Sequence, residues 1–281
     1  GVFLAVIAMF GWGIGDFLIK KPTQKIGEYK SMFYVQFFIL ILTLPVLFTL
    51  AFNNNLKIDL MNFLLIILSA VFDLIAYFNF LKGIKTGEVA IVTPISSVYS
   101  IVTVILSVIF LNETLSVLKI TGIVLGILGI VLTSFDLKNL HNIHTVKGIK
   151  NGIISLFGWG LFVFIIGLVE ANIGWLSTFV FSNIIIAILI MIFVLIKNKN
   201  IKILKPGFQK RLFIIGFLYT IAWSSMNLGF SYSNVSVVSL ISSLSPVVTV
   251  ILALLILKET LKTNQKIGIG IIILSLVLLS I

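Results

Sequence analysis

Two carboxylates lie inside apolar runs of this sequence, where a charged side chain is costly. Asp16 falls within Val2–Ile19, and Asp73 lies in the middle of Leu60–Leu81 with Tyr77 one helical turn later on the same face. Ionisable residues in such runs usually face a cavity or a neighbouring helix. Each carboxylate could bind a cationic group or take up a proton. The alternative is a carboxyl held by hydroxyls of a neighbouring helix, or by water near a helix end.

Tryptophans flanked by glycines form a second group of candidates. The segment Phe10-Gly11-Trp12-Gly13 matches Phe157-Gly158-Trp159-Gly160 at a shift of 147 positions. Trp near a membrane surface is often only an interfacial anchor. Small residues, however, let helices approach closely. We therefore expect Trp12 and Trp159 to point toward a central space.

The densest polar cluster within an apolar run comprises Trp223, Ser224, Ser225 and Asn227. At a shift of 146 positions Ser225 aligns with Asn79, so both halves keep a small hydrogen-bonding group at this level. We add Asn79, Trp223 and Asn227 to the candidate substrate-binding residues.

Hydroxyl-bearing residues recur beside prolines in two further runs. Serines often hydrogen-bond only to their own helix. Prolines remove helix hydrogen bonds, so Pro94 and Pro246 should kink or break these runs. Broken helices near hydroxyls in two halves of a chain point to a midplane binding site. The candidates selected here are Ser96, Tyr99, Ser242 and Ser245.

Other chemistry finds little support. The chain has no cysteine, which excludes disulfides and thiolate chemistry. His141 and His144 lie three apart in a loop without a carboxylate cluster, so we expect a solvated loop and no metal site. Glu113 and Glu259 are expected to cap the helices that follow them. We predict no catalytic residues and no cofactor, and therefore no enzyme.

Composition indicates a membrane protein. Mean hydropathy is +1.23, with 59% hydrophobic and 10% charged residues, which is far from soluble composition. The net charge of +11 arises from lysines in short gaps between apolar runs, and membrane-flanking lysines explain it better than nucleic-acid binding. We therefore expect lipid, and no nucleic acid, around this chain.

Ten apolar runs approach the length of about 20 residues that spans a bilayer. The first begins at Gly1 without a Met, so we expect a few residues upstream, and its Asp16 favours a true span over a signal peptide. The expected spans are Val2–Ile19, Ser31–Phe52, Leu60–Leu81, Val89–Leu111, Leu118–Phe135, Ile149–Val169, Trp175–Ile196, Leu212–Phe230, Val235–Leu257 and Ile267–Ile281.

The chain is internally duplicated. Val102-Thr103-Val104-Ile105-Leu106 is identical to Val248-Thr249-Val250-Ile251-Leu252 at a shift of 146, and Glu-Thr-Leu follows at both 113–115 and 259–261. Five spans per half force the second copy to enter the membrane from the opposite side. We predict an all-α membrane protein with ten transmembrane helices as two inverted five-helix repeats, 1–137 and 148–281, joined by the loop 138–147.

The basic residues predict an orientation. All of them except Lys57 and Lys119 lie in gaps after odd-numbered spans. The positive-inside rule places these gaps in the cytoplasm. We therefore expect both termini to be extracytoplasmic, in the cytoplasmic membrane of a prokaryote.

The Trp-Gly motifs, the doubled Glu-Thr-Leu and the 5+5 duplication together resemble EamA-type transporters of the drug/metabolite transporter superfamily. The resemblance covers essentially the whole chain and implies ten helices around a central cavity. The family's proline motif is similar to Ser245-Pro246-Val247-Val248-Thr249, whereas Ser100 takes the proline's place in the first half. Lys30 is the nearest counterpart of an Arg frequent at the start of span two. Family members are often drawn with cytoplasmic termini, and the lysine distribution favours the opposite here.

We expect a secondary transporter that exports small metabolites, amino acids or drugs by alternating access, through a cavity lined by spans one, three, four, six, eight and nine. Its partners would be the lipid bilayer, a small-molecule substrate and protons or another coupling ion; the oligomeric state is left open. Alternatives are ion-coupled uptake and a nucleotide-sugar-type transporter, although basic partners for phosphate are absent from the spans. A channel and a membrane-embedded transferase are more distant alternatives.

Overall fold

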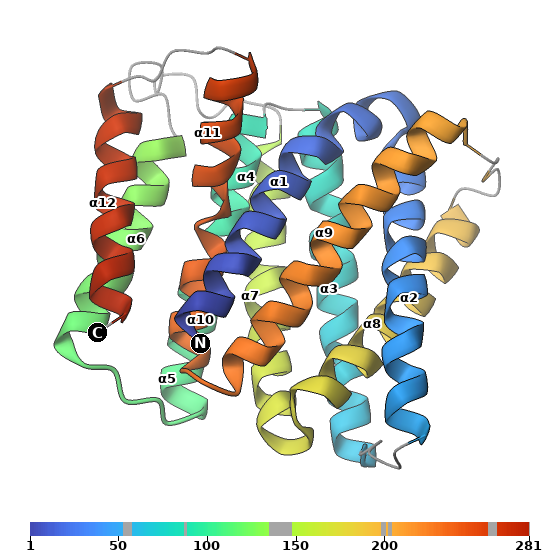
Figure 1. Cartoon of the computed structure of the whole chain (residues 1–281), viewed down its shortest axis with the longest axis horizontal. Coiled ribbons are helices and arrows are strands. Elements are labelled where there is room, and N and C mark those ends of the chain that lie inside the picture. The colour runs from blue at the N-terminus through green and yellow to red at the C-terminus, as the bar shows by residue number, and fades with distance from the viewer. Residues whose placement is uncertain are drawn as a thin grey trace.

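The protein is all-helical in the computed structural model, which describes residues 1–52, 58–86, 89–134, 148–197, 201, 204–257 and 263–280 (Figure 1). No β-strand occurs within these ranges. The helices are α1 (Val2–Ile26), α2 (Glu28–Phe52), α3 (Leu60–Thr86), α4 (Val89–Ser97), α5 (Tyr99–Phe110), α6 (Val117–Ser134), α7 (Ile149–Ile173), α8 (Trp175–Lys197), α9 (Pro206–Phe230), α10 (Val235–Ser243), α11 (Ser245–Leu257) and α12 (Thr263–Ser280).

Six of these helices, α1, α2, α3, α7, α8 and α9, are long and apolar enough to cross a membrane. The others are shorter apolar helices. Large apolar side chains such as Phe52, Ile109 and Phe157 are exposed on the outside of the bundle, where water would not tolerate so many of them. The chain is therefore an integral membrane protein.

Two of the expected spans are interrupted. The fourth is divided at Val98 into α4 and α5, and the ninth at Leu244 into α10 and α11. At each interruption a backbone hydrogen bond spans three residues instead of the four of an α-helix. The Ile101 N–H donates to Val98 O, and the Val247 N–H donates to Leu244 O, both at 3.0 Å. The two positions are related by the shift of 146.

Proline accounts for only one interruption directly. Pro246 is the second residue of α11 and removes a donor next to Leu244. In the first half Ser100 occupies the corresponding place, yet the helix is interrupted there as well. The Ser243 hydroxyl donates to the Ser100 hydroxyl at 3.0 Å, so the two interruptions lie against each other in the centre of the bundle.

The helices pack in matched pairs. α1 packs along α9 and α3 along α7, and the shift of about 146 residues exchanges these two pairs. The contacts of α1 with α11 correspond in the same way to those of α7 with α5. α6 packs against α12 at one end of the molecule, and α2 packs against α8 toward the other end (Figure 1).

Glycines allow the two principal pairs to approach closely. A Cβ on Gly11 would lie 2.9 Å from both the Leu218 carbonyl oxygen and the Ala222 Cβ. A Cβ on Gly158 would lie 2.9 Å from the corresponding atoms of Phe72 and Ala76. The glycines on either side of each Trp therefore sit in helix contacts, and the Trp side chain between them is turned toward the bundle centre.

Glu113 caps a helix other than the expected one. Its carboxylate accepts hydrogen bonds from the backbone N–H groups of Val235 at 2.6 Å and Ser236 at 3.2 Å, and also from the Ser236 hydroxyl. These groups form the start of α10, whereas we expected Glu113 to cap α6. A carboxylate at a helix N-terminus satisfies free N–H groups and the helix dipole, and α10 offers both. Glu259 lies outside the described residues.

Candidate substrate-binding cavity

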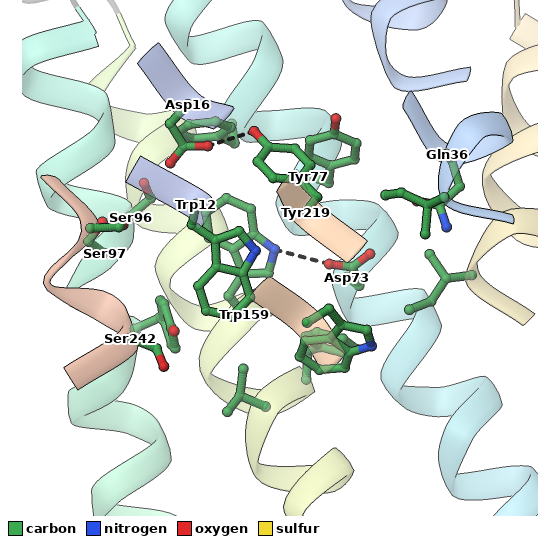
Figure 2. A pocket seen from close by; sticks show the side chains of 18 of the residues that line it. Trp12, Asp16, Gln36, Asp73, Tyr77, Ser96, Ser97, Trp159, Tyr219 and Ser242 are labelled. Atoms are coloured by element: carbon green, nitrogen blue, oxygen red, sulfur yellow. Dashed lines mark hydrogen bonds between the residues drawn. The ribbon is translucent and has the colours of Figure 1, made fainter. Parts of the chain in front are cut away.

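A cavity of about 140 Å³ lies between the helix pairs α1–α9 and α3–α7 (Figure 2). Side chains from both halves of the chain line it. They are Trp12, Asp16, Gln36, Ile39, Asp73, Tyr77, Phe80, Ser96, Ser97, Tyr99, Trp159, Phe162, Val163, Asn183, Ile186, Tyr219, Trp223, Ser242 and Ser245.

The lining is itself nearly duplicated. Trp12 corresponds to Trp159 and Gln36 to Asn183 at a shift of 147, while Ser96 corresponds to Ser242 at a shift of 146. The chemically important departure is at the carboxylates. Asp73 has Tyr219 as its counterpart, and Asp16 has Val163. The duplicated framework therefore surrounds a cavity whose charge is asymmetric.

Each carboxylate is held by an aromatic donor on the helix packed against its own. The Tyr219 hydroxyl on α9 donates to Asp16 Oδ1 on α1 at 2.7 Å. The Trp159 indole nitrogen on α7 donates to Asp73 Oδ1 on α3 at 3.0 Å. Figure 2 shows both interactions across the cavity. One neutral donor leaves most of each carboxylate's acceptor capacity unused, because an ionised carboxylate offers about four acceptor sites.

Tyr77 is the third polar group in this part of the lining. The residue is 8% exposed, and its hydroxyl is buried without a hydrogen-bond partner in the described part of the chain. A buried hydroxyl without a partner is destabilising. Tyr77 lines the cavity, and its hydroxyl oxygen is covered by protein in this conformation.

Aromatic rings form much of the remaining wall. Trp223 stacks on Phe162 at a centroid distance of 5.0 Å and lies 6.4 Å from Trp12. Trp159 lies 5.2 Å from Phe80 and 6.4 Å from Tyr99. The Trp223 indole nitrogen is 3.4 Å from the Ser182 hydroxyl, which fixes the ring orientation.

The serines beside the helix interruptions already have backbone partners. The Ser96 hydroxyl bonds to the carbonyls of Val92 and Thr93 in its own helix, at 2.9 Å each. The Ser242 hydroxyl lies 3.5 Å from the Ala5 carbonyl of α1. Both side chains are fully buried, and their hydroxyl hydrogens are directed at these carbonyls.

The comparisons with known proteins agree with this architecture. The family model of the EamA-like transporter family matches residues 1–135 and again 146–281. The chain belongs to the EamA-like transporter family.

Relatives extend the likeness over the full chain. An uncharacterized transporter of Archaeoglobus fulgidus is 20% identical over 99% of this chain and 97% of its own length. An uncharacterized protein of Methanocaldococcus jannaschii is 36% identical over 34% of this chain and 71% of its own length. A crystal structure aligns with a TM-score of 0.74 at 12% identity, covering 99% of this chain and 94% of that one, which is a likeness of fold. Family and relatives point to a membrane transporter rather than an enzyme.

Most of the candidate residues of this EamA-like chain are brought together. The ten that line the cavity are Trp12, Asp16, Asp73, Tyr77, Ser96, Tyr99, Trp159, Trp223, Ser242 and Ser245. Asn79 and Asn227 lie elsewhere. Asn79 pairs with Asn151 at 3.0 Å in the α3–α7 contact, and the Asn227 amide donates to the Trp223 carbonyl at 2.9 Å. The Asn79 amide therefore links α3 to α7, and the Asn227 amide bonds within α9; neither residue is among those that line the cavity.

Sequence reasoning missed several lining residues. Gln36 and Asn183 place α2 and α8 at the cavity, in addition to the six spans expected there. Applying the repeat shift to the second and seventh spans would have aligned these two amides. Tyr219 was missed although it is the counterpart of Asp73. His141 and His144 lie outside the described residues, and within the described ones no cluster of metal-ligating side chains occurs.

Proposed function

We propose that this chain is a secondary transporter that exports small metabolites, amino acids or drugs by alternating access through the central cavity. Membership of a transporter family supports transport. The position of the cavity supports its assignment as the transport site. It lies between the helix pairs α1–α9 and α3–α7, which are related by the repeat, and residues of both interrupted spans line its wall.

The repeat also suggests how access alternates. We infer ten spans in two inverted repeats, 1–137 and 148–281, with α4–α5 and α10–α11 each forming one interrupted span. The matched helix contacts support this arrangement. Two equivalent pairs around one site allow one bundle to rock against the other, exposing the site to each side in turn.

The test is transport by purified protein in lipid vesicles. A radiolabelled panel of amino acids, amines and organic acids identifies a solute that wild-type protein moves. Trp223→Ala should reduce its flux at least tenfold while membrane insertion is retained, because the stacked wall of the cavity is lost. Phe217→Ala is the matched control, an outward-facing aromatic residue on the same helix, 46% exposed. Unchanged flux in Trp223→Ala would place the pathway elsewhere.

The orientation inferred from the lysines has its own test. The natural chain lacks cysteine, so single cysteines can be introduced without removing any. Thr114→Cys lies between α5 and α6, and Lys150→Cys lies at the start of α7; both positions are exposed. A membrane-impermeant maleimide added to intact cells should label Thr114→Cys only. Labelling of Lys150→Cys alone would reverse the orientation.

Transport alternatives differ in observable ways. Ion-coupled uptake would accumulate solute in the opposite direction under the same ion gradient. A nucleotide-sugar substrate is disfavoured because the described residues lining the cavity include no Lys, Arg or His to pair with phosphate. A channel would show flux that neither saturates nor accelerates with solute on the far side. A transferase would form product in detergent solution.

A further inference from the structure

We infer that the cavity binds a small organic cation with an ammonium head, held by Asp16 and Asp73 inside an aromatic wall. This inference rests on the proposed transport function, since it names the substrate class of the same site. Two carboxylates face the cavity, and neither has an ion-pair partner among the described residues. Lys20, one turn beyond Asp16 in α1, is exposed instead.

An unpaired charge in a medium of low dielectric constant is costly, so a buried carboxylate pairs with a cation, is fully hydrogen-bonded or takes up a proton. Here each carboxylate has one neutral donor, Tyr219 or Trp159. Those donors orient the two groups without neutralising them. A ligand that brings one positive charge would supply the missing partner.

The walls suit a cation better than a neutral polar solute. Trp12, Trp159 and Trp223 all face the cavity, and the rings of Phe162 and Trp223 stack against each other. The faces of aromatic rings attract ammonium groups, and a set of such rings around one space is a recurrent solution for quaternary ammonium ligands. Because the rings are apolar, they also accept the methyl or methylene groups that surround the charge.

Size restricts the ligand further. The cavity volume of about 140 Å³ is close to that of an engineered cavity of about 150 Å³ that binds benzene. A ligand about the size of benzene is therefore expected in this conformation of the protein. Tyr77 lines the cavity, and its hydroxyl, which has no hydrogen-bond partner among the described residues, would donate one hydrogen bond to a polar group on the ligand once the side chain turns toward it.

Binding to detergent-solubilised wild-type protein tests the inference without requiring transport. The probes are choline, its neutral carbon analogue 3,3-dimethyl-1-butanol, and glycine betaine, which keeps the quaternary ammonium but adds a carboxylate. Tryptophan fluorescence and calorimetry report binding. Choline should bind at least tenfold more tightly than either of the others. Equal or tighter binding of the neutral analogue would overturn the role of charge. Equal or tighter binding of glycine betaine would assign the site to zwitterions instead.

Variants locate the charge partners. Asp16→Asn and Asp73→Asn should each weaken choline binding at least tenfold and leave binding of 3,3-dimethyl-1-butanol unchanged. Asp59→Asn, at the start of α3 and away from the cavity, should bind as wild type. Tyr77→Phe should weaken choline but not tetramethylammonium, which has no hydrogen-bonding group. Full choline affinity in both carboxylate variants would refute the assignment.

The outcomes separate this inference from the proposed function. Selective choline binding without transport of choline or any other solute would overturn the transport function and leave the cation site standing. Saturable transport of another solute, with no preference for choline over its neutral analogue, would overturn only the cation site.

Discussion

The Thr249 hydroxyl donates a hydrogen bond to the Gly13 carbonyl oxygen at 3.0 Å, tying α11 to α1. Its counterpart Thr103 donates to the Gly160 carbonyl at 3.1 Å, tying α5 to α7. The preceding valines fit against the same glycines, because a Cβ on Gly13 would lie 2.5 Å from Val248 Cβ. The pentapeptide that is identical in the two halves therefore encodes a helix contact.

Thr249→Val should remove the hydrogen bond with little change in shape. Hydrogen bonds between membrane helices contribute about 0.6 kcal/mol on average, so we expect a loss of that order in the free energy of unfolding. The double variant with Thr103→Val should lose about twice as much, since the two contacts are separate. Denaturant unfolding in detergent measures both. Thr121→Val is the control, because that exposed hydroxyl bonds to the Val117 carbonyl in its own helix.

Gly158→Ala should disturb the contact of α7 with α3. The added methyl group would meet the Phe72 carbonyl oxygen and Ala76 Cβ at 2.9 Å, both on or next to backbone that cannot move easily. Overpacking of this kind costs about 1–3 kcal/mol. Gly270→Ala in α12 is the control, because no atom of the described residues lies within 4 Å of the added Cβ. If thermal unfolding shows equal midpoints for the two variants, the glycine contact is not tight.

Glu113→Gln should loosen the start of α10. The carboxylate uses both oxygens to receive Val235 N–H, Ser236 N–H and the Ser236 hydroxyl, whereas an amide has one acceptor oxygen. Hydrogen bonds to charged groups contribute about 1.5–3 kcal/mol, and we expect a loss within that range. Glu28→Gln breaks the exposed ion pair with Lys85 and should cost less than about 1 kcal/mol. The midpoints of thermal unfolding compare the two, and equal losses would argue against the Glu113 cap.

Asp73→Asn should uncouple transport from a proton gradient if Asp73 carries the proton. The amide cannot take up a proton, yet it keeps an oxygen that accepts the Trp159 hydrogen bond. Because Asp73→Asn should also weaken cation binding, both fluxes are compared at saturating solute: exchange without a pH gradient should persist there, while flux driven by the gradient is lost. Vesicles with an imposed pH difference measure this. Intact pH-driven flux in Asp73→Asn would assign coupling to another group, and Asp16→Asn is then the variant to compare.

Local composition allowed much of the helical layout to be predicted. Each expected apolar run coincides with a helix or with one interrupted pair of helices, because about 20 apolar residues suffice to span a bilayer and the gaps between them are polar. The carboxylates Asp16 and Asp73 were likewise identifiable from their position inside such runs.

Only the tertiary structure decided which side chains meet. Asp16 and its donor Tyr219 are 203 positions apart, and Glu113 reaches Ser236 across 123 positions. The sequence alone placed Asn79 and Asn227 at the cavity, but neither lines it: Asn79 accepts a hydrogen bond from Asn151 of α7, and the Asn227 amide donates within α9. The sequence by itself determined the apolar runs and the duplication, because hydropathy and repetition can be read along the chain. The cavity, in contrast, depends on the packing of helices that are far apart in the sequence.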